Sequence, residues 1–131
     1  MTIIDSSCWV EYYRPDGRSK VQQAVTAVIK AGDAATCGII AVEILGFIAR
    51  KAEFEIVSAD FGALIDAGVR PDDFSRAVTM GRALRSHGVT VPATDLIIAS
   101  IACGRGALLL HADEHFVTIA SHTKLSERFV R

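Results

Sequence analysis

Short, continuously apolar segments alternate along the chain with longer segments in which apolar residues recur at helical spacing. The apolar segments Thr2–Ile4, Ala34–Cys37 and Ala107–Leu110 are too short for stable helices, and we interpret them as buried strands. Strands that are apolar throughout and alternate with helices indicate a parallel sheet with helices on both faces. The pattern therefore predicts an α/β fold, a three-layer α/β/α sandwich around a central, mainly parallel sheet.

Helices are predicted wherever apolar residues return every three or four positions. A clear example is Lys20–Lys30, which Ser19 precedes as a candidate cap. The other predicted helices cover residues 8–13, 39–52, 53–67, 72–87 and 92–103, and a short helix after Phe116 ends at Ala120. In helix 72–87 the apolar face is expected to comprise Phe74, Ala77, Val78, Gly81 and Leu84.

Composition limits the class of protein. The chain has 131 residues, of which 50% are hydrophobic and 22% charged, so we expect one globular domain over residues 1–131. No apolar run approaches the ~20 residues that a membrane span needs, and the N-terminus lacks the basic start of a signal peptide. The three cysteines form no C-x-x-C pair and are expected to be free thiols in a reducing cytoplasm.

Opposite charges almost balance, with 14 Lys and Arg against 15 Asp and Glu. The whole surface therefore has no excess of positive charge that would attract nucleic acid. Any polyanion that binds must meet a local site.

Three aspartates are predicted to meet at one edge of the sheet. Asp5 directly follows the first strand, and Asp113 lies just past the strand Ala107–Leu110. Asp95 begins a helix that runs back antiparallel to that strand, which returns it to the same edge. Ligands of parallel sheets bind beyond the carboxyl ends of the strands. Taken singly, each aspartate has a simpler interpretation as a helix cap or a turn residue.

Glu43 is harder to explain as a surface residue. Its neighbours three and four positions away are Ile39, Ile40, Gly46 and Phe47, all of them nonpolar. An ionised carboxylate that faces inward costs several kcal/mol unless it is paired or bound to a metal. A salt bridge with Arg or Lys is the structural alternative to a metal.

The four carboxylates together favour a divalent cation. Clustered carboxylates raise each other's pKa unless a cation neutralises them. Oxygen ligands with positions left for water suit Mg²⁺ or Mn²⁺, and such an ion can polarise a phosphoryl oxygen and activate water. A phosphodiester is therefore the expected substrate class.

Four short segments of the chain carry a resemblance to a known family. They are Ile3–Ser7, Val42–Leu45, Val91–Ala99 and Leu109–Phe116, and their order and spacing extend over essentially the whole chain. The chain resembles a PIN domain, specifically the small VapC-type toxin ribonucleases of bacterial toxin–antitoxin pairs.

The resemblance implies the α/β/α sandwich and an endoribonuclease that cleaves RNA with one or two Mg²⁺ or Mn²⁺ ions. It implies that Asp5, Glu43, Asp95 and Asp113 are the catalytic residues that ligate the metal. It further implies a homodimer and a cognate antitoxin protein that blocks the site. Ser7 matches a position at which a small polar residue often supports the site.

One residue departs from the family pattern. Many relatives have a further acid two residues after the fourth carboxylate, where this chain has His115. The departure favours one protein-held metal completed by the RNA phosphate. Glu114 is not expected to compensate, because neighbouring residues of a helix do not point in one direction.

Three other functions compete with the nuclease. In an Asp-nucleophile phosphatase, Asp5 would be phosphorylated. Such a site usually requires a second Asp at the position that Ser7 occupies in this chain. A signal-receiver domain requires an acidic pair after the first strand and a Lys after a late strand. In this chain Asp5 is unpaired and His111 follows the late strand. We expect His111 to be packed or hydrogen-bonded instead. A non-catalytic PIN-like binding module would retain the fold but has no evident need for all four acids.

Overall fold

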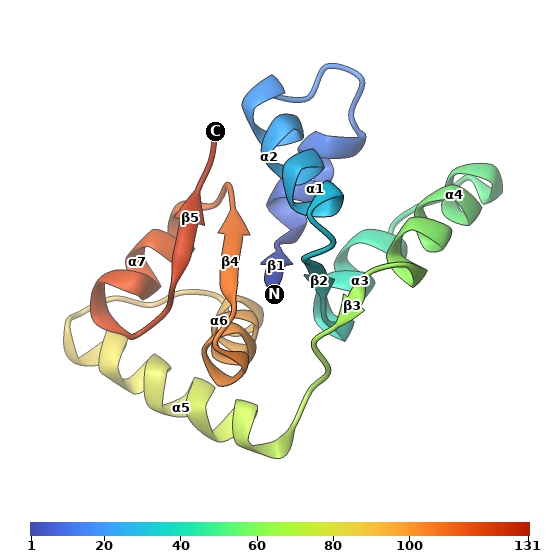
Figure 1. The fold of residues 1–131 in the computed structure, drawn as a ribbon. Helices are drawn as coiled ribbons and strands as arrows, with labels where there is room; N and C mark the ends of the chain where they lie inside the picture. Colours follow the sequence, from blue (N-terminus) through green and yellow to red (C-terminus); the bar gives the residue numbers. More distant parts are fainter.

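A computed structural model describes all of residues 1–131, which form one five-stranded sheet and seven helices (Figure 1). The elements in chain order are β1 Thr2–Ile4, α1 Ser6–Tyr13, α2 Ser19–Lys30, β2 Ala34–Thr36, α3 Gly38–Leu45, α4 Lys51–Gly62, β3 Ile65–Asp66, α5 Pro71–Ser86, α6 Ala93–Arg105, β4 Leu108–His111, α7 Glu114–His122 and β5 Glu127–Phe129.

The sheet has the strand order β3-β2-β1-β4-β5, and every pair of neighbouring strands is parallel. The chain builds outward from β1 to β2 and β3, then crosses back to β4 and β5. The strand order therefore reverses between β1 and β4, where open α/β sheets bind their ligands. The predicted fold class is confirmed.

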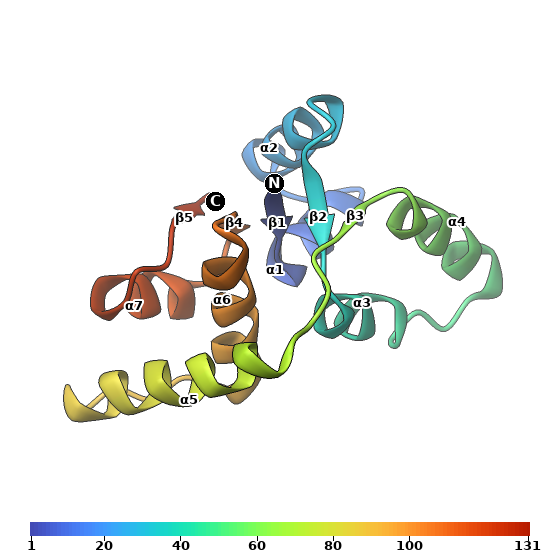
Figure 2. The same cartoon turned by 60° about the horizontal axis from the view of Figure 1, so that its bottom comes forward.

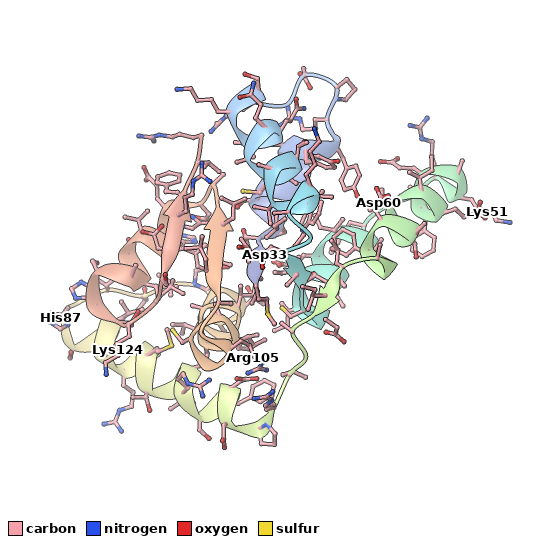
Figure 3. The ribbon with its side chains drawn as sticks, in the orientation of Figure 1. Asp33, Lys51, Asp60, His87, Arg105 and Lys124 are labelled. Carbon is pink, nitrogen blue, oxygen red and sulfur yellow. The ribbon has the colours of Figure 1, made fainter.

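The helices form two groups (Figures 1 and 2). In one group α5, α6 and α7 pack against one another, and in the other α1 packs against α2 and α3. Helix α4 projects from the body of the molecule in both views. Its far end carries Lys51, whereas the Asp60 end returns toward the sheet (Figure 3). Asp60 Oδ2 accepts a hydrogen bond of 2.8 Å from the Tyr13 hydroxyl, which ties α4 to α1.

The core lies on both faces of the central strands. Ile3 and Ile4 of β1 and Leu109 and Leu110 of β4 are fully buried, as expected for parallel strands covered on two sides. Trp9 of α1 is also buried, stacked against Tyr13 and packed against Phe61 of α4. No helix of the structure has both the length and the apolar character needed to cross a membrane.

The turn from α6 into β4 requires a glycine. Gly106 ends α6 with φ 61°, in the left-handed region that side chains with a Cβ rarely adopt. This turn sends the chain directly from the buried helix into the buried strand. The helix–turn–strand order expected for this stretch is confirmed, with the helix extended to Arg105.

Two predicted helices have the wrong boundaries. The helix expected over 39–52 ends at Leu45, and the helix expected over 53–67 begins at Lys51 and ends at Gly62. The apolar run continues through Phe47 and Ile48 after α3 has ended. Hydrophobicity alone therefore gave no sign of the break between α3 and α4. Part of the second segment, β3, is an edge strand of two residues beside Ala35 and Thr36 of β2.

The end of the chain also differs from the prediction. Helix α7 begins at Glu114 rather than after Phe116, and β5 was not predicted at all. Strand β5 is an edge strand whose sequence, Glu127-Arg128-Phe129, lacks the apolar character of the central strands. Ser19 is wrong as a cap, because α2 has Arg18 at its N-cap position without a side-chain hydrogen bond.

The buried face of α5 is rotated from the predicted one. Ala77 and Leu84 are buried as expected, but Phe74 is 49% and Val78 is 64% exposed. The buried stripe is instead formed by Asp73, Ala77, Met80 and Leu84. A buried aspartate on this stripe has no counterpart in a hydrophobic pattern, which is why the prediction chose the wrong face.

Asp73 joins α5 to α6 through a buried ion-pair network. Its two carboxylate oxygens accept hydrogen bonds of 2.9 and 2.7 Å from Arg105, and Arg76 lies 3.0 Å away. Arg105 extends from α6 toward α5 (Figure 3) and also donates to the Ala67 carbonyl. Ser100 donates to the Asp73 carbonyl at 2.6 Å. These contacts fix α6, the helix that carries Asp95.

Candidate metal centre

Asp5 and Asp113 extend from neighbouring central strands. The Asp5 N–H donates to the Leu110 carbonyl at 2.9 Å, which continues the β1–β4 pairing one residue past β1. Each aspartate is also the N-cap of the next helix. Asp5 Oδ2 accepts from the Ser7 N–H, and Asp113 Oδ1 accepts from the His115 N–H. Each aspartate therefore caps a helix and also lies at the predicted edge of the sheet. The two roles are compatible, because capping uses only some of the lone pairs of a carboxylate.

Asp95 meets Asp113 through the antiparallel course of α6. It lies in the first turn of α6 and is almost completely buried. Its carboxylate Oδ2 is 2.9 Å from His115 Nδ1. One potential ligand atom from each of Asp95, Asp113 and His115 lies within 4.8 Å of the other two. Asp95 is not a capping residue, because the N-cap position of α6 is Pro92.

Glu43 reaches the same region from α3, which packs against α6. Its side chain is half-buried, and Oε1 accepts a hydrogen bond of 3.2 Å from the Ser6 hydroxyl. No lysine or arginine pairs with it, so the salt bridge considered as an alternative is absent.

The acids act on one another electrostatically. Burial raises the pKa of Asp5, and the charge of Asp113 raises it further, although hydrogen bonds from Ser7 oppose the shift. Burial also raises the pKa of Glu43 and of Asp95, and the charge of Asp5 adds to both shifts. Asp5 therefore acts on both Glu43 and Asp95, and the charge of Asp95 also acts directly on Glu43.

The site lacks the side chain that would ordinarily neutralise it. Within 4.0 Å of the four carboxylates the only basic group is the His115 imidazole, close to Asp95 and Asp113. Asp5 and Glu43 lie outside the close group of Asp95, Asp113 and His115 and are coupled to it electrostatically. Carboxylate oxygens without Arg or Lys beside them are the donor set that Mg²⁺ and Mn²⁺ prefer. The residues present therefore fit a divalent cation.

Ser7 connects two parts of the site. Its hydroxyl donates to Asp5 Oδ2 at 2.6 Å and accepts the Ala112 N–H at 2.9 Å. Ala112 directly precedes Asp113, so one hydroxyl fixes the Asp5 carboxylate relative to the loop after β4. Ser6 makes the corresponding contact with Glu43. The sequence singled out Ser7 but not this use of Ser6.

His111 positions Asp113 through its backbone. The buried imidazole accepts the Asp113 N–H at Nδ1 (3.3 Å), and Nε2 lies 2.5 Å from Glu127 Oε2. Because Nδ1 accepts, the proton of the neutral ring is on Nε2 and points at Glu127. The expectation that His111 is packed and hydrogen-bonded is confirmed. Its partner Glu127 was missed because β5 gave no strand pattern.

Comparison with known proteins identifies the family. The PIN domain model matches residues 2–121. Over 128 residues the chain is 34% identical to Ribonuclease VapC11 of Mycobacterium tuberculosis, a match that covers 95% of this chain and 96% of the relative.

Two solved structures share the fold. VapBC2 from Rickettsia felis, bound to a DNA fragment from its promoter, superposes with a TM-score of 0.77 at 15% identity over 99% of this chain and 98% of that one. VapBC-5 from Mycobacterium tuberculosis, of the VapBC family of toxin–antitoxin systems, gives a TM-score of 0.73 at 16% identity over 98% of each chain. The match to the PIN domain model and the 34% identity to VapC11 agree with the parallel sheet and its strand-order reversal between β1 and β4. This chain belongs to the PIN domain family.

Proposed function

We propose that this chain is a metal-dependent endoribonuclease whose site is formed by Asp5, Glu43, Asp95 and Asp113. The observation that carries the proposal is the close approach of Asp95 and Asp113, to which Asp5 and Glu43 are electrostatically coupled, beside the strand-order reversal and with no Arg or Lys near them. The 34% identity to a relative named as a ribonuclease supports RNA as the substrate.

The four acids would hold Mg²⁺ or Mn²⁺, and the bound ion would supply Lewis-acid polarisation of a phosphoryl oxygen and a water of lowered pKa. The protein's own part is to position the ligands. Ser7 fixes Asp5, Ser6 orients Glu43, and His111 holds the backbone of Asp113. Such supporting contacts typically change metal affinity or activity 10–100-fold when they are removed.

Cleavage of RNA with and without Mg²⁺ or Mn²⁺ tests the proposal. Asp5→Asn and Asp95→Asn remove a charge from the site at nearly constant shape, and we expect each to lower the rate by at least about 100-fold. Asp16→Asn, at an exposed turn, is the matched control and should cleave like wild type. The expected products carry 5′-phosphate and 3′-hydroxyl ends. Equal rates for wild type and both site variants would refute the assignment.

The rival enzyme classes are not favoured by the geometry. A phosphoaspartate nucleophile must be reached by its substrate, whereas Asp5 is 3% exposed and its Oδ2 already accepts two hydrogen bonds from Ser7. The cleavage assay distinguishes the nuclease from the remaining alternative, a non-catalytic binding module. Such a module would leave RNA uncut in the presence of Mg²⁺ and of Mn²⁺.

We propose further that the chain is the toxin of a two-protein module. The proposal is supported by the identity to a VapC ribonuclease and by the shared fold with a member of a toxin–antitoxin family. A cognate antitoxin encoded beside this chain should bind it and abolish cleavage. Cleavage that continues at full rate in the purified complex would contradict the toxin role and leave the nuclease assignment intact.

A further inference from the structure

His115 occupies a defined place between two of the proposed ligands. Its backbone N–H donates to Asp113 Oδ1 at 2.9 Å, which fixes the first turn of α7 against that carboxylate. Its side chain is 49% exposed, so an ion can reach the ring from solvent. The ring nitrogen Nδ1 points at the acids, 2.9 Å from Asp95 Oδ2 and 3.5 Å from Asp113 Oδ1.

These separations are those of atoms that share one ion. Two ligand atoms at right angles around an octahedral ion, each about 2.1 Å from it, lie about 3 Å apart. The contact of Nδ1 with Asp95 matches this spacing, and the contact with Asp113 is slightly longer. Small side-chain adjustments would therefore place one nitrogen and two carboxylate oxygens on the same cation.

The nitrogen changes which cation the site should prefer. Mg²⁺ is a hard ion that favours oxygen ligands in near-ideal octahedral geometry. Imidazole suits first-row transition metals, and Mn²⁺ also accepts carboxylates and water. A ligand set made only of carboxylate oxygens would distinguish Mg²⁺ from Mn²⁺ weakly. A ligand set that includes an imidazole nitrogen favours Mn²⁺.

We propose that His115 is a nitrogen ligand of the ion held by Asp95 and Asp113, and that it makes the site bind Mn²⁺ in preference to Mg²⁺. The inference rests on the proposed metal-dependent function and adds one protein ligand and an ion preference to it. In place of the further acid, the chain has a ligand of different chemistry.

A purely hydrogen-bonding role for His115 predicts the opposite behaviour. If Nδ1 only donates a proton to Asp95, it competes with the ion for the same carboxylate. Removing the imidazole would then tighten the binding of Mn²⁺ and Mg²⁺ alike, and no nitrogen would be detected at the bound ion.

Electron spin-echo spectroscopy of bound Mn²⁺ distinguishes the two roles without an activity assay. The full chain, without a histidine tag and stripped of metal, is loaded with Mn²⁺, and modulation from a directly coordinated ¹⁴N is recorded. We expect this signal in wild type, its loss in His115→Asp and His115→Gln, and its retention in His122→Gln. His122 is the matched control because it lies at the other end of α7 and stacks on His87.

Calorimetric titration with each ion supplies the second measurement. We expect the ratio of Mn²⁺ to Mg²⁺ affinity to fall by about tenfold or more in His115→Asp, which restores an acid and should still bind metal. Wild-type protein that binds Mn²⁺ without a ¹⁴N signal, or a variant with unchanged ion preference, would overturn the inference while the acidic metal site stands. Failure of wild type to bind either ion would overturn the proposed function itself.

Discussion

At the scale of single residues, Asp5 caps a helix but carries a carboxylate whose charge is disfavoured by burial. It caps α1, and its carboxylate is almost fully buried and electrostatically coupled to Asp113. Burial and the charge of Asp113 raise its pKa, which means that the ionised form is disfavoured in the folded protein. The ionised Asp5 carboxylate is therefore expected to cost stability in the metal-free protein, a trade-off that is common at functional sites.

Asp5→Asn should stabilise the metal-free protein while it abolishes cleavage. Asn caps helices as well as Asp does, so the contact with the Ser7 N–H survives and only the buried charge is lost. We expect the melting temperature in chelator to rise by about 3–5 °C, the equivalent of roughly 1 kcal/mol in a chain of this size. Asp16→Asn should leave it unchanged, and a lower melting temperature for Asp5→Asn would contradict the expected cost to stability.

At the scale of secondary-structure elements, the α5–α6 contact depends on Asp73. The Asp73 carboxylate is almost inaccessible to solvent and pairs with Arg105, which is itself nearly buried. The hydrogen bond from Arg105 holds the pKa of Asp73 far below its usual range, although burial opposes the shift. Because α6 carries Asp95, this distant pair helps to place a proposed metal ligand.

Asp73→Ala should lower the free energy of unfolding by about 3–5 kcal/mol at pH 7, because it leaves the Arg105 charge buried without a partner. A lowered pKa stabilises the fold above the unfolded-state value of 3.8 and loses that contribution as pH falls toward the folded-state value. The difference between wild type and variant should therefore shrink below about pH 4.

Urea denaturation at several pH values measures this dependence. The neighbouring variant Asp72→Ala, at an exposed position in the first turn of α5, serves as the control and should change stability by no more than about 1 kcal/mol. Asp73→Asn provides a second variant if Asp73→Ala does not fold. A difference between wild type and Asp73→Ala that is independent of pH would show that the ion pair is not its source.

At the scale of the whole molecule, large apolar side chains are exposed at several places, and two of these places are candidate protein contacts. One is the outer face of α5, with Phe74 and Val78 one helical turn apart. The other is the segment from α3 through the following loop to α4. Val42, Phe47, Phe54 and Ile56 are exposed there, and Phe54 and Ile56 point to different sides of α4. Contiguous exposed apolar patches mark protein contacts, whereas single exposed apolar residues are normal. Two such surfaces suit the two expected partners, a second copy of the chain and an antitoxin.

We predict that the second copy covers the α5 surface. Light scattering coupled to gel filtration should give wild type about twice the chain mass of 14.0 kDa and Val78→Glu a single chain mass. Ile56→Glu is the matched control, because Ile56 and Val78 are both 64% exposed on helices. A dimer that survives Val78→Glu but dissociates in Ile56→Glu would place the contact on α4 instead.

The hydrophobic pattern was sufficient for the central strands and the edge at which the acids meet. Strands β1, β2 and β4 are buried on both faces, so an unbroken apolar run encodes them directly. The edge strands β3 and β5 are held by pairing with one neighbour and carry polar residues, so no local pattern indicates them. The same reason explains the missed contact between His111 and Glu127.

The sequence by itself determined the α/β class and the four acids. It placed Asp5, Asp95 and Asp113 beside strand or helix ends, because the two periodicities and the chain order fix which segments end at that edge, and it placed Glu43 on the apolar face of a helix. Only the tertiary structure decided which potential ligand atoms lie close together, and these belong to Asp95, Asp113 and His115. It brought His115 Nδ1 to 2.9 Å from Asp95 Oδ2, and it placed Asp73 rather than Phe74 in the core. Those outcomes depend on how α6 and α7 pack against the sheet, and packing between distant segments leaves no periodic trace in the chain.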